Sequence, residues 1–181
     1  MTKNSVWVAL AIAGSFAISN GTAYAGSATA IMGVTATVSA SCNMSVNAMA
    51  FPTYSLPLTG TNGGSAVALT LPLTVTCTNG TIATIALDMG QHQGDAVVVN
   101  GVSVPGSRQM VPGFTGAWLT YGLYQDAAHS IFWGPTVASS VTVTGTGNTP
   151  VAGLNIYGYI PGGQTPPVGT YSDTVTITLT F

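Results

Sequence analysis

The segment Asp173-Thr174-Val175-Thr176-Ile177-Thr178-Leu179-Thr180-Phe181 alternates threonine with apolar residues and ends the sequence. Successive side chains of a β-strand point to opposite faces, so the apolar residues share one face and the threonines the other. This pattern predicts a half-buried strand made of residues that favour strands. Because no strand follows it, we expect a segment from elsewhere to cover its second edge. The apolar face consists of Val175, Ile177, Leu179 and Phe181.

The first 25 residues have the features of a secretory signal peptide. Lys3 gives a positive start, residues 6–18 are mostly apolar, and Ala23-Tyr24-Ala25 fits the small-x-small cleavage pattern. The apolar run is too short to span a membrane. We therefore expect export through the periplasm and a mature protein that begins at Gly26 and has no membrane span.

The composition favours β-structure and excludes one class of partner. Once the signal peptide is removed, Arg108 is the only Lys or Arg, and the sequence contains no glutamate. A chain this poor in basic residues cannot neutralise phosphates, which excludes nucleic acid as a partner. The low charge fits either a small domain solvated by its hydroxyl groups or a surface that packs against other copies of the chain.

Cys42 and Cys77 are the only cysteines. Export places them in an oxidising compartment, where a structural disulfide is expected. Such a bond would stabilise the fold by about 4 kcal/mol on a chain-entropy estimate. A metal site built on two cysteines at this spacing would lack further ligands, so we expect neither a metal nor a cofactor.

A second alternation runs through residues 27–41 and is too long for one strand of a domain this size. We divide it into an outer piece at 27–35 and an inner piece near 36–44 that carries Cys42. The expected organisation is a signal peptide at 1–25, an N-terminal extension at 26–35 and a β-sandwich domain at 36–181. Ile31 is the one residue that breaks the parity. The apolar face of the extension is Ala28, Ala30, Met32, Val34 and Ala36.

The rest of the chain predicts short strands separated by turns, which is typical of an all-β sandwich with Greek-key connections. Asn79-Gly80 and Asn100-Gly101 predict hairpins with type I′ turns, and Pro72 predicts an edge position or a bulge. Long loops are expected at 45–66 and 105–116. The expected strands are 67–77, 81–88, 96–99, 102–104, 118–124, 131–133, 139–144 and 154–160.

No residue pattern supports catalysis. His92 and His129 each lie three residues from an aspartate, Asp95 and Asp126, but these pairs fall in expected loops and are interpreted as solvated. There is no nucleophile elbow and no phosphate-binding loop. Aromatic residues at strand spacing are interpreted as core rather than as a sugar-binding face: Trp118, Tyr121, Tyr124, Trp133, Tyr157 and Tyr159.

Several blocks together resemble the spore coat protein U domain family. They are residues 119–126 (LTYGLYQD), residues 132–134 (FWG), residues 156–160 (IYGYI) and residues 169–175 (GTYSDTV), with the two cysteines at matching places. The resemblance covers essentially the whole mature chain. It implies a subunit of an archaic chaperone–usher pilus, with an incomplete immunoglobulin-like β-sandwich that lacks its last strand.

The resemblance also implies an assembly route. A groove beside the last strand would be filled first by a strand of a periplasmic chaperone and then by the N-terminal extension of a neighbouring subunit, at an outer-membrane usher. The acceptor residues would be those of the terminal strand, and the donor residues would be those of the extension. The product would be a homopolymeric surface pilus used for adhesion and biofilm formation, and basic residues of the chaperone would anchor the carboxylate of Phe181.

Two alternatives remain open. One is a secreted coat or adhesive domain with the same fold that does not polymerise. The other is an outer-membrane β-barrel, whose last strand also alternates and ends in an aromatic residue. The cysteine pair, Pro72 within a strand and the loop at 45–66 argue against the barrel.

Overall fold

A computed structural model describes residues 25–56, 63–94, 97–99, 102–104, 107–113 and 116–181. The predicted signal peptide therefore lies outside the described residues except for Ala25. The chain separates into two compact units at residues 37 and 38. In the first unit, residues 25–37 have no regular secondary structure and expose their side chains. In this single chain, the predicted strand at 27–35 is not part of a sheet.

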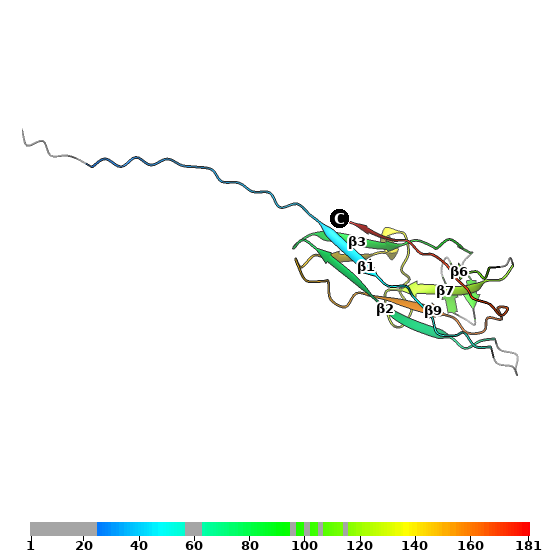
Figure 1. Cartoon of the computed structure of the whole chain (residues 1–181). Helices are drawn as coiled ribbons and strands as arrows, with labels where there is room; N and C mark the ends of the chain where they lie inside the picture. The colour runs from blue at the N-terminus through cyan, green and yellow to red at the C-terminus, as the bar shows by residue number, and fades with distance from the viewer. Residues whose placement is uncertain (1–24, 57–62, 95–96, 100–101, 105–106, 114–115) are drawn as a thin grey trace, which may run out of the picture. The chain divides into compact units, whose positions relative to one another are not determined.

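The described part of the second unit consists of β-strands and one short 3-10 helix, η1 (Figure 1). A five-stranded sheet has the order β1-β2-β9-β7-β6, a three-stranded sheet has the order β10-β3-β8, and β4 pairs with β5. The elements are β1 (Cys42–Val46), β2 (Val67–Cys77), β3 (Ile82–Leu87), β4 (Val97–Val99), β5 (Val102–Val104), β6 (Arg108–Met110), β7 (Leu119–Tyr124), η1 (Val137–Ser139), β8 (Val141–Thr144), β9 (Asn155–Ile160) and β10 (Ile177–Thr180).

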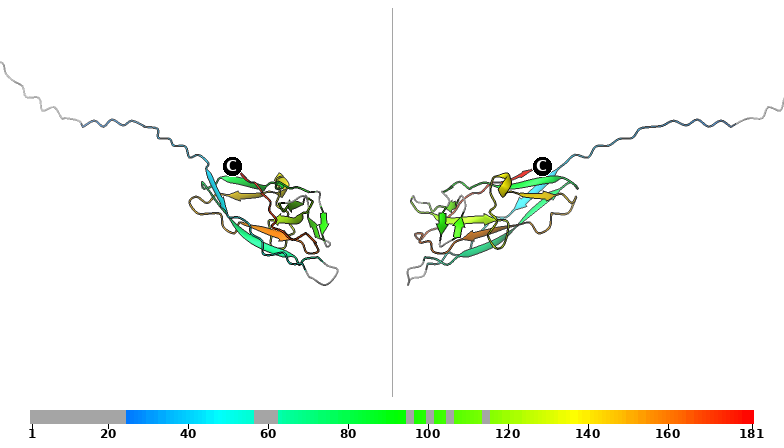
Figure 2. Two further views of the ribbon diagram at one scale, coloured as in Figure 1. Left: turned by 45° about the vertical axis from the view of Figure 1, so that its right-hand side comes forward. Right: turned by 180° about the vertical axis from the view of Figure 1, so that it is seen from behind.

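The two larger sheets enclose an apolar core, which confirms the predicted sandwich (Figure 2). Alternate residues of each strand point inward, so β2 and β3 show buried positions at every second residue. Trp133 is fully buried in this core and donates from Nε1 to the carbonyl of Ile85 at 2.9 Å. The buried apolar residues include Leu73, Val75, Cys77, Ala83, Ile85, Leu87, Leu119, Leu123, Ile156 and Ile160.

The turn at residues 78–81 corrects one prediction. β2 and β3 lie in different sheets, so the turn joins the sheets and does not close a hairpin. Gly80 has a φ of 80°, while Asn79 is not among the residues with positive φ. The Thr81 amide donates to the Thr78 carbonyl at 3.0 Å. A type I′ turn needs positive φ at both central residues, so the predicted turn type is wrong and the geometry is that of a type II turn.

Other boundaries also differ from the sequence prediction. β1 begins only at Cys42, so the inner strand predicted near 36–44 is shorter than expected. Residues 108–110 were expected in a loop but form β6 against β7. The predicted strand at residues 131–133 is reduced to one isolated bridge between Phe132 and Tyr124. β10 is shorter than the alternation suggested and begins at Ile177.

The prediction that Pro72 lies at a sheet edge is confirmed locally, because β2 has no partner strand on one side at this residue. β2 pairs with β9 over residues 67–72 and with β1 over residues 73–77. Because the Leu73 amide donates to the Leu154 carbonyl, the nitrogen of Pro72 points to the other side of β2. On that side β1 has already ended, so the missing N–H of proline leaves no gap in a ladder.

Cys42 and Cys77 form the predicted disulfide. They are opposite each other in the β1–β2 ladder, at the first pair of β1, with their Cα atoms 4.1 Å apart. This short separation is typical of a non-hydrogen-bonded antiparallel pair. The bond therefore fastens the start of β1 to the buried end of β2.

Removal of the disulfide should weaken the domain. We expect Cys42→Ser to lower periplasmic yield and to reduce the free energy of unfolding by about 2–5 kcal/mol, measured by urea unfolding of the purified protein. The double variant Cys42→Ser/Cys77→Ser is the control that separates loss of the bond from the effect of a free thiol. Wild-type yield and stability in both variants would contradict a stabilising role.

Candidate functional site

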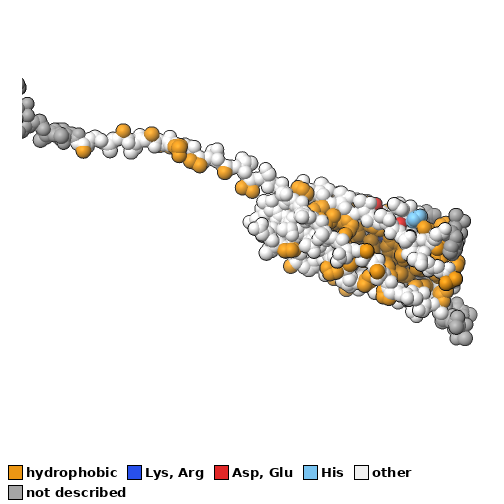
Figure 3. Space-filling model, in the orientation of Figure 1, with side chains coloured by type: hydrophobic (Ala, Val, Ile, Leu, Met, Phe, Trp, Pro, Cys, Tyr) orange, Lys and Arg blue, Asp and Glu red, His pale blue; other side chains and the backbone are white. Residues whose placement is uncertain are grey.

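An open apolar groove runs along the sandwich between two segments that are distant in sequence (Figure 3). One side is the N-terminal wall, residues 46–51, and the other is the C-terminal wall, residues 171–177. This part of the groove has a volume of about 380 Å³. Past Met49 and Phe51 it continues into a hollow of about 580 Å³, bordered by residues 52–56 and 166–171.

The floor of the groove is the inner face of the sandwich. Tyr121 and Leu123 of β7 and Ile156 of β9 line the first part, and Leu119 and Ile160 line the second. Gly158 of β9 lets the N-terminal wall pack closely on the sheet, since a Cβ there would fall 2.5 Å from the Met49 sulfur and 2.7 Å from the Phe51 ring. These floor residues are at most 5% exposed, whereas the wall residues Met49, Phe51 and Val175 are only half-buried and could be covered further by another strand.

The free edge of β10 faces this groove. Ile177 and Leu87 are opposite each other, and in the same register the Asp88 amide donates to the Thr176 carbonyl at 2.9 Å. Hydrogen-bonded pairs alternate with non-hydrogen-bonded ones along an antiparallel ladder. The backbone N–H and C=O groups of Ile177 and Leu179 therefore point away from β3.

β1 presents a second free edge to the groove. The Thr78 amide donates to the Ser41 carbonyl at 2.9 Å, in register with the β1–β2 ladder. By the same alternation, the backbone groups of Met44 and Val46 point away from β2. Both strands are outermost in their sheets, and Val46 and Ile177 both line the groove. Among the described residues, the groove therefore combines an apolar floor with two strand edges that pair with no neighbouring strand.

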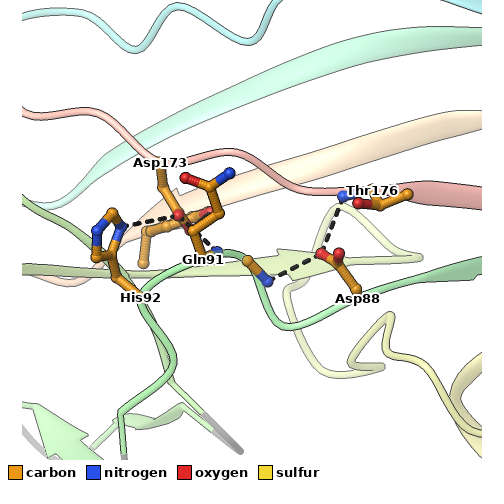
Figure 4. Close-up of polar contacts among 7 residues, drawn as sticks. Asp88, Gln91, His92, Asp173 and Thr176 are labelled. Atoms are coloured by element: carbon orange, nitrogen blue, oxygen red, sulfur yellow. Dashed lines mark hydrogen bonds and ion pairs between the residues drawn. The ribbon is translucent and has the colours of Figure 1, made fainter.

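The C-terminal wall is held by side chains where β10 has not yet begun (Figure 4). Asp88 lies just after β3, and its Oδ1 accepts from the amides of Thr176 and Gly90, each at 2.9 Å. Burial alone would raise the pKa of Asp88, but hydrogen bonds from Thr176 and Gly90 and the nearby charge of Arg108 lower it below its usual value. The ionised carboxylate is therefore the form that holds the wall.

Asp173 makes the reciprocal contact from the wall to the loop that follows β3. Its side chain is only 2% exposed, and its carboxylate accepts from the Gln91 amide at 3.0 Å, the Tyr121 hydroxyl at 2.7 Å and His92 Nδ1 at 3.2 Å. Burial and the bond to Asp173 raise the pKa of Tyr121, which keeps it a neutral donor. Asp88 and Asp173 together are called the carboxylate clamp below.

Arg108 of β6 lies beside the clamp and is fully buried. Its guanidinium donates to the carbonyls of Asp88, Leu87 and Trp133 and lies 4.9 Å from the centre of the Phe132 ring. Burial lowers the pKa of Arg108 to about 10, so the side chain stays cationic at neutral pH. No pattern in the sequence indicates a role for Arg108.

The far end of the groove is fastened by Tyr54 and Gln164. The Tyr54 hydroxyl donates to the Pro161 carbonyl at 3.1 Å and accepts from the Gln164 amide at 3.0 Å. The side-chain amide of Gln164 bonds both the N–H and the C=O of Thr120, and so takes the place of a neighbouring strand beside β7. These contacts fix the segments that border the second hollow.

The structure places the predicted acceptor residues unequally. Val175 and Ile177 line the groove, Leu179 packs half-buried against the core, and Phe181 is 56% exposed. The N-terminal wall, including Met49 and Phe51, was not predicted. Its only signal was that apolar residues continue through a segment that otherwise had the composition of a loop.

The predicted donor residues lie in the first unit. Met32 and Val34 are 81% and 79% exposed, and Ala28, Ala30 and Ala36 are exposed as well. Ile31, which breaks the parity, is also fully exposed.

The histidines and aromatic residues depart in part from their interpretation. His92 contacts Asp173, while Asp95 lies outside the described residues. His129 has a φ of 56° and stacks on Tyr159, with ring centres 4.6 Å apart, so it is not a freely solvated loop residue. Tyr121, Tyr124 and Trp133 are buried as predicted, whereas Trp118 is 55% exposed.

Within the described part of the chain, no group of three His, Cys, Asp or Glu side chains is arranged to hold a metal ion. The same residues include no helix that is both long enough and apolar enough to cross a membrane.

The described domain is a β-sandwich with an apolar groove between the outermost strands of its two larger sheets. A sequence model of the Spore Coat Protein U domain matches residues 28–178. Protein U of Myxococcus xanthus is 33% identical over 163 residues, which cover 88% of each chain. The protein belongs to the spore coat protein U domain family.

A solved structure has a similar fold. It is the CsuC–CsuE chaperone–tip adhesion subunit pre-assembly complex from the archaic chaperone-usher Csu pili of Acinetobacter baumannii. The match has a TM-score of 0.52 and 18% identity, and covers 80% of this chain but only 41% of the solved chain. At this identity the match supports the fold alone, and it agrees with the predicted immunoglobulin-like β-sandwich.

Acid should loosen the C-terminal wall. The folded-state pKa of Asp88 is lowered, so its contribution to stability is complete above the unfolded pKa of about 3.9 and is lost as pH falls through the lower folded value. Asp88→Asn keeps a side-chain oxygen acceptor but does not titrate.

We therefore expect the free energy of unfolding to fall less in Asp88→Asn than in wild type between about pH 6 and pH 2.5, measured by urea unfolding. Asp126→Asn removes a carboxylate in a loop outside the groove whose pKa is also lowered, mainly by hydrogen bonds from Ile131 and Ser130; comparison with it separates acid loss at the wall from acid loss at that loop. An equal fall in wild type and Asp88→Asn would mean that Asp88 does not stabilise the wall.

Proposed function

We propose that this protein is a structural subunit of an archaic chaperone–usher pilus and polymerises by donor-strand exchange. The observation that carries the proposal is the open groove, where an apolar floor lies between the unpaired edges of β1 and β10. An exposed edge beside an uncovered core favours aggregation. An inserted strand removes both defects, because it pairs the backbone groups and covers the apolar floor.

The donor in this proposal is the N-terminal extension, residues 26–35, of a neighbouring copy. Its alternating face is fully available, and Met32 and Val34 carry most of its apolar surface. Burial of apolar surface contributes about 25 cal/mol per Å² before ordering costs. The three alanines on the same face add little, so Met32 and Val34 should dominate the free energy of insertion.

The groove also has to be protected before assembly. We infer that a periplasmic chaperone first supplies the covering strand and that an outer-membrane usher then exchanges it for the donor of the next subunit. The complex of the structural relative joins a chaperone to a pilus subunit before assembly, which supports this order. The product would be a homopolymeric fibre at the cell surface that serves adhesion and biofilm formation, with no catalytic activity.

Charge placed on the donor face should abolish polymers and leave the monomer intact. Met32→Asp and Val34→Asp alter exposed residues outside the folded sandwich, yet each would bury a carboxylate in the apolar groove, at a cost of several kcal/mol. The readout is the ladder of multimers in unheated periplasmic and surface extracts on denaturing gels, with electron microscopy of fibres.

Thr35→Asp is the matched control, because it adds the same charge on the opposite parity of the extension. We expect it to keep the ladder. If multimers persist in Met32→Asp and Val34→Asp, the donor assignment is wrong. If wild type is exported only as monomer, without fibres, the protein is a non-polymerising coat or adhesive domain instead.

A further inference from the structure

The hydrogen-bond ladder between β3 and β10 ends at the pair Asp88 and Thr176, where one of the two usual backbone bonds is replaced by a bond to a side chain. In a regular antiparallel pair, Asp88 and Thr176 would each donate to the carbonyl of the other. Only half of this pair exists, since the Asp88 amide donates to the Thr176 carbonyl at 2.9 Å. The Thr176 amide donates instead to the side-chain Oδ1 of Asp88, also at 2.9 Å.

Arg108 accounts for the missing half of the pair. Its Nε and Nη2 donate to the Asp88 carbonyl at 2.9 Å and 2.6 Å. A carbonyl oxygen has two lone pairs, and the planar guanidinium fork supplies two parallel donors to it. The Asp88 carbonyl is therefore already bonded to Arg108, and the Thr176 amide donates instead to the side-chain carboxylate of Asp88.

This exchange lies where the C-terminal wall begins to leave β3. Beyond Thr176 the wall has no ladder with β3, and its next fixed points are Asp173 and the backbone pair of Ser172 with Val111 at 3.0 Å. Val175, between these points, lines the groove with its side chain half-buried. Side-chain hydrogen bonds, and not a sheet ladder, therefore set the distance between the C-terminal wall and β3.

We propose that Arg108 is a positioning residue for the open groove: by occupying the Asp88 carbonyl, it stops the β3–β10 ladder at this point and keeps the C-terminal wall placed to receive an incoming strand. This inference rests on the proposed function for its consequence in assembly. The incoming strand is a second copy's extension or a chaperone strand, and Arg108 touches neither.

The cost of burying Arg108 supports a specific role. The side chain is fully buried, forms no ion pair with a carboxylate among the described residues, and leaves Nη1 without a hydrogen-bond partner there. A buried cation that is only partly compensated is expensive, and an apolar side chain of similar length would fill the same space at lower cost. Its three carbonyl acceptors tie β6 to the end of β3 and to Trp133.

The first test uses the wild-type mature protein. Scalar couplings across hydrogen bonds, measured by NMR on isotope-labelled protein, identify the acceptor of the Thr176 amide. We expect a coupling to the side-chain carboxyl carbon of Asp88 and none to its backbone carbonyl carbon. A coupling to the backbone carbonyl would overturn the proposal, whatever any variant does.

The second test is Arg108→Met, which removes the guanidinium and keeps the length of the side chain. The Asp88 carbonyl becomes free, so the Thr176 coupling should move to the backbone carbonyl carbon. The multimer fraction in unheated extracts should fall about tenfold, equivalent to about 1.4 kcal/mol in the exchange equilibrium. Asp126→Asn is the control for a single charge change away from the groove and should leave both readouts unchanged.

The outcomes separate the two proposals. A folded Arg108→Met with wild-type multimers, or with an unchanged Thr176 coupling, overturns the role of Arg108 and leaves donor-strand exchange in place. Absence of multimers in wild type overturns donor-strand exchange and, with it, the assembly role of Arg108. If Arg108→Met does not accumulate, the wild-type coupling decides whether Arg108 diverts the ladder.

Discussion

β1 and β10 are the outermost strands of their sheets, so among the described strands the backbone N–H and C=O groups on their outer sides have no strand to bond to. The rest of the structure depends on how these groups are satisfied. Within each sheet, alternate residues of these strands bond to the neighbouring strand. The backbone N–H and C=O groups of the residues between them point to the opposite side, toward the groove. Apolar side chains along both walls of the groove, such as Met49 and Val175, are only half-buried at the same place.

The few charged side chains of the protein are concentrated where the C-terminal wall of the groove begins. Arg108, Asp88 and Asp173 lie together at the start of the C-terminal wall, and each is bonded mainly to backbone or hydroxyl groups. In a chain with so few ionisable side chains, three at one place is a strong concentration. Elsewhere the surface relies on threonine and serine, which solvate a strand without adding charge.

The sequence allowed the all-β class, the disulfide and most strands to be predicted, because period-two patterns and cysteine context are local signals. β2 matched its predicted range, whereas β6 and the N-terminal wall were missed, since three residues around Arg108 carry no alternation. The turn at Asn79-Gly80 suggested a hairpin, because local residues specify φ but not which sheet the next strand joins. The carboxylate clamp depends on contacts between residues far apart in the chain, such as Asp88 with Thr176, which no local pattern encodes.

The position of the disulfide has a mechanical consequence for a fibre of the proposed kind. Tension on a donor extension enters the subunit at the first residue of β1, and an antiparallel pair pulled from that end would open one rung at a time. Cys42–Cys77 is the first rung, so the load passes through a covalent bond into β2, which lies between β1 and β9 in the larger sheet. The subunit would then bear force by shearing a whole sheet, and β1 would not peel away.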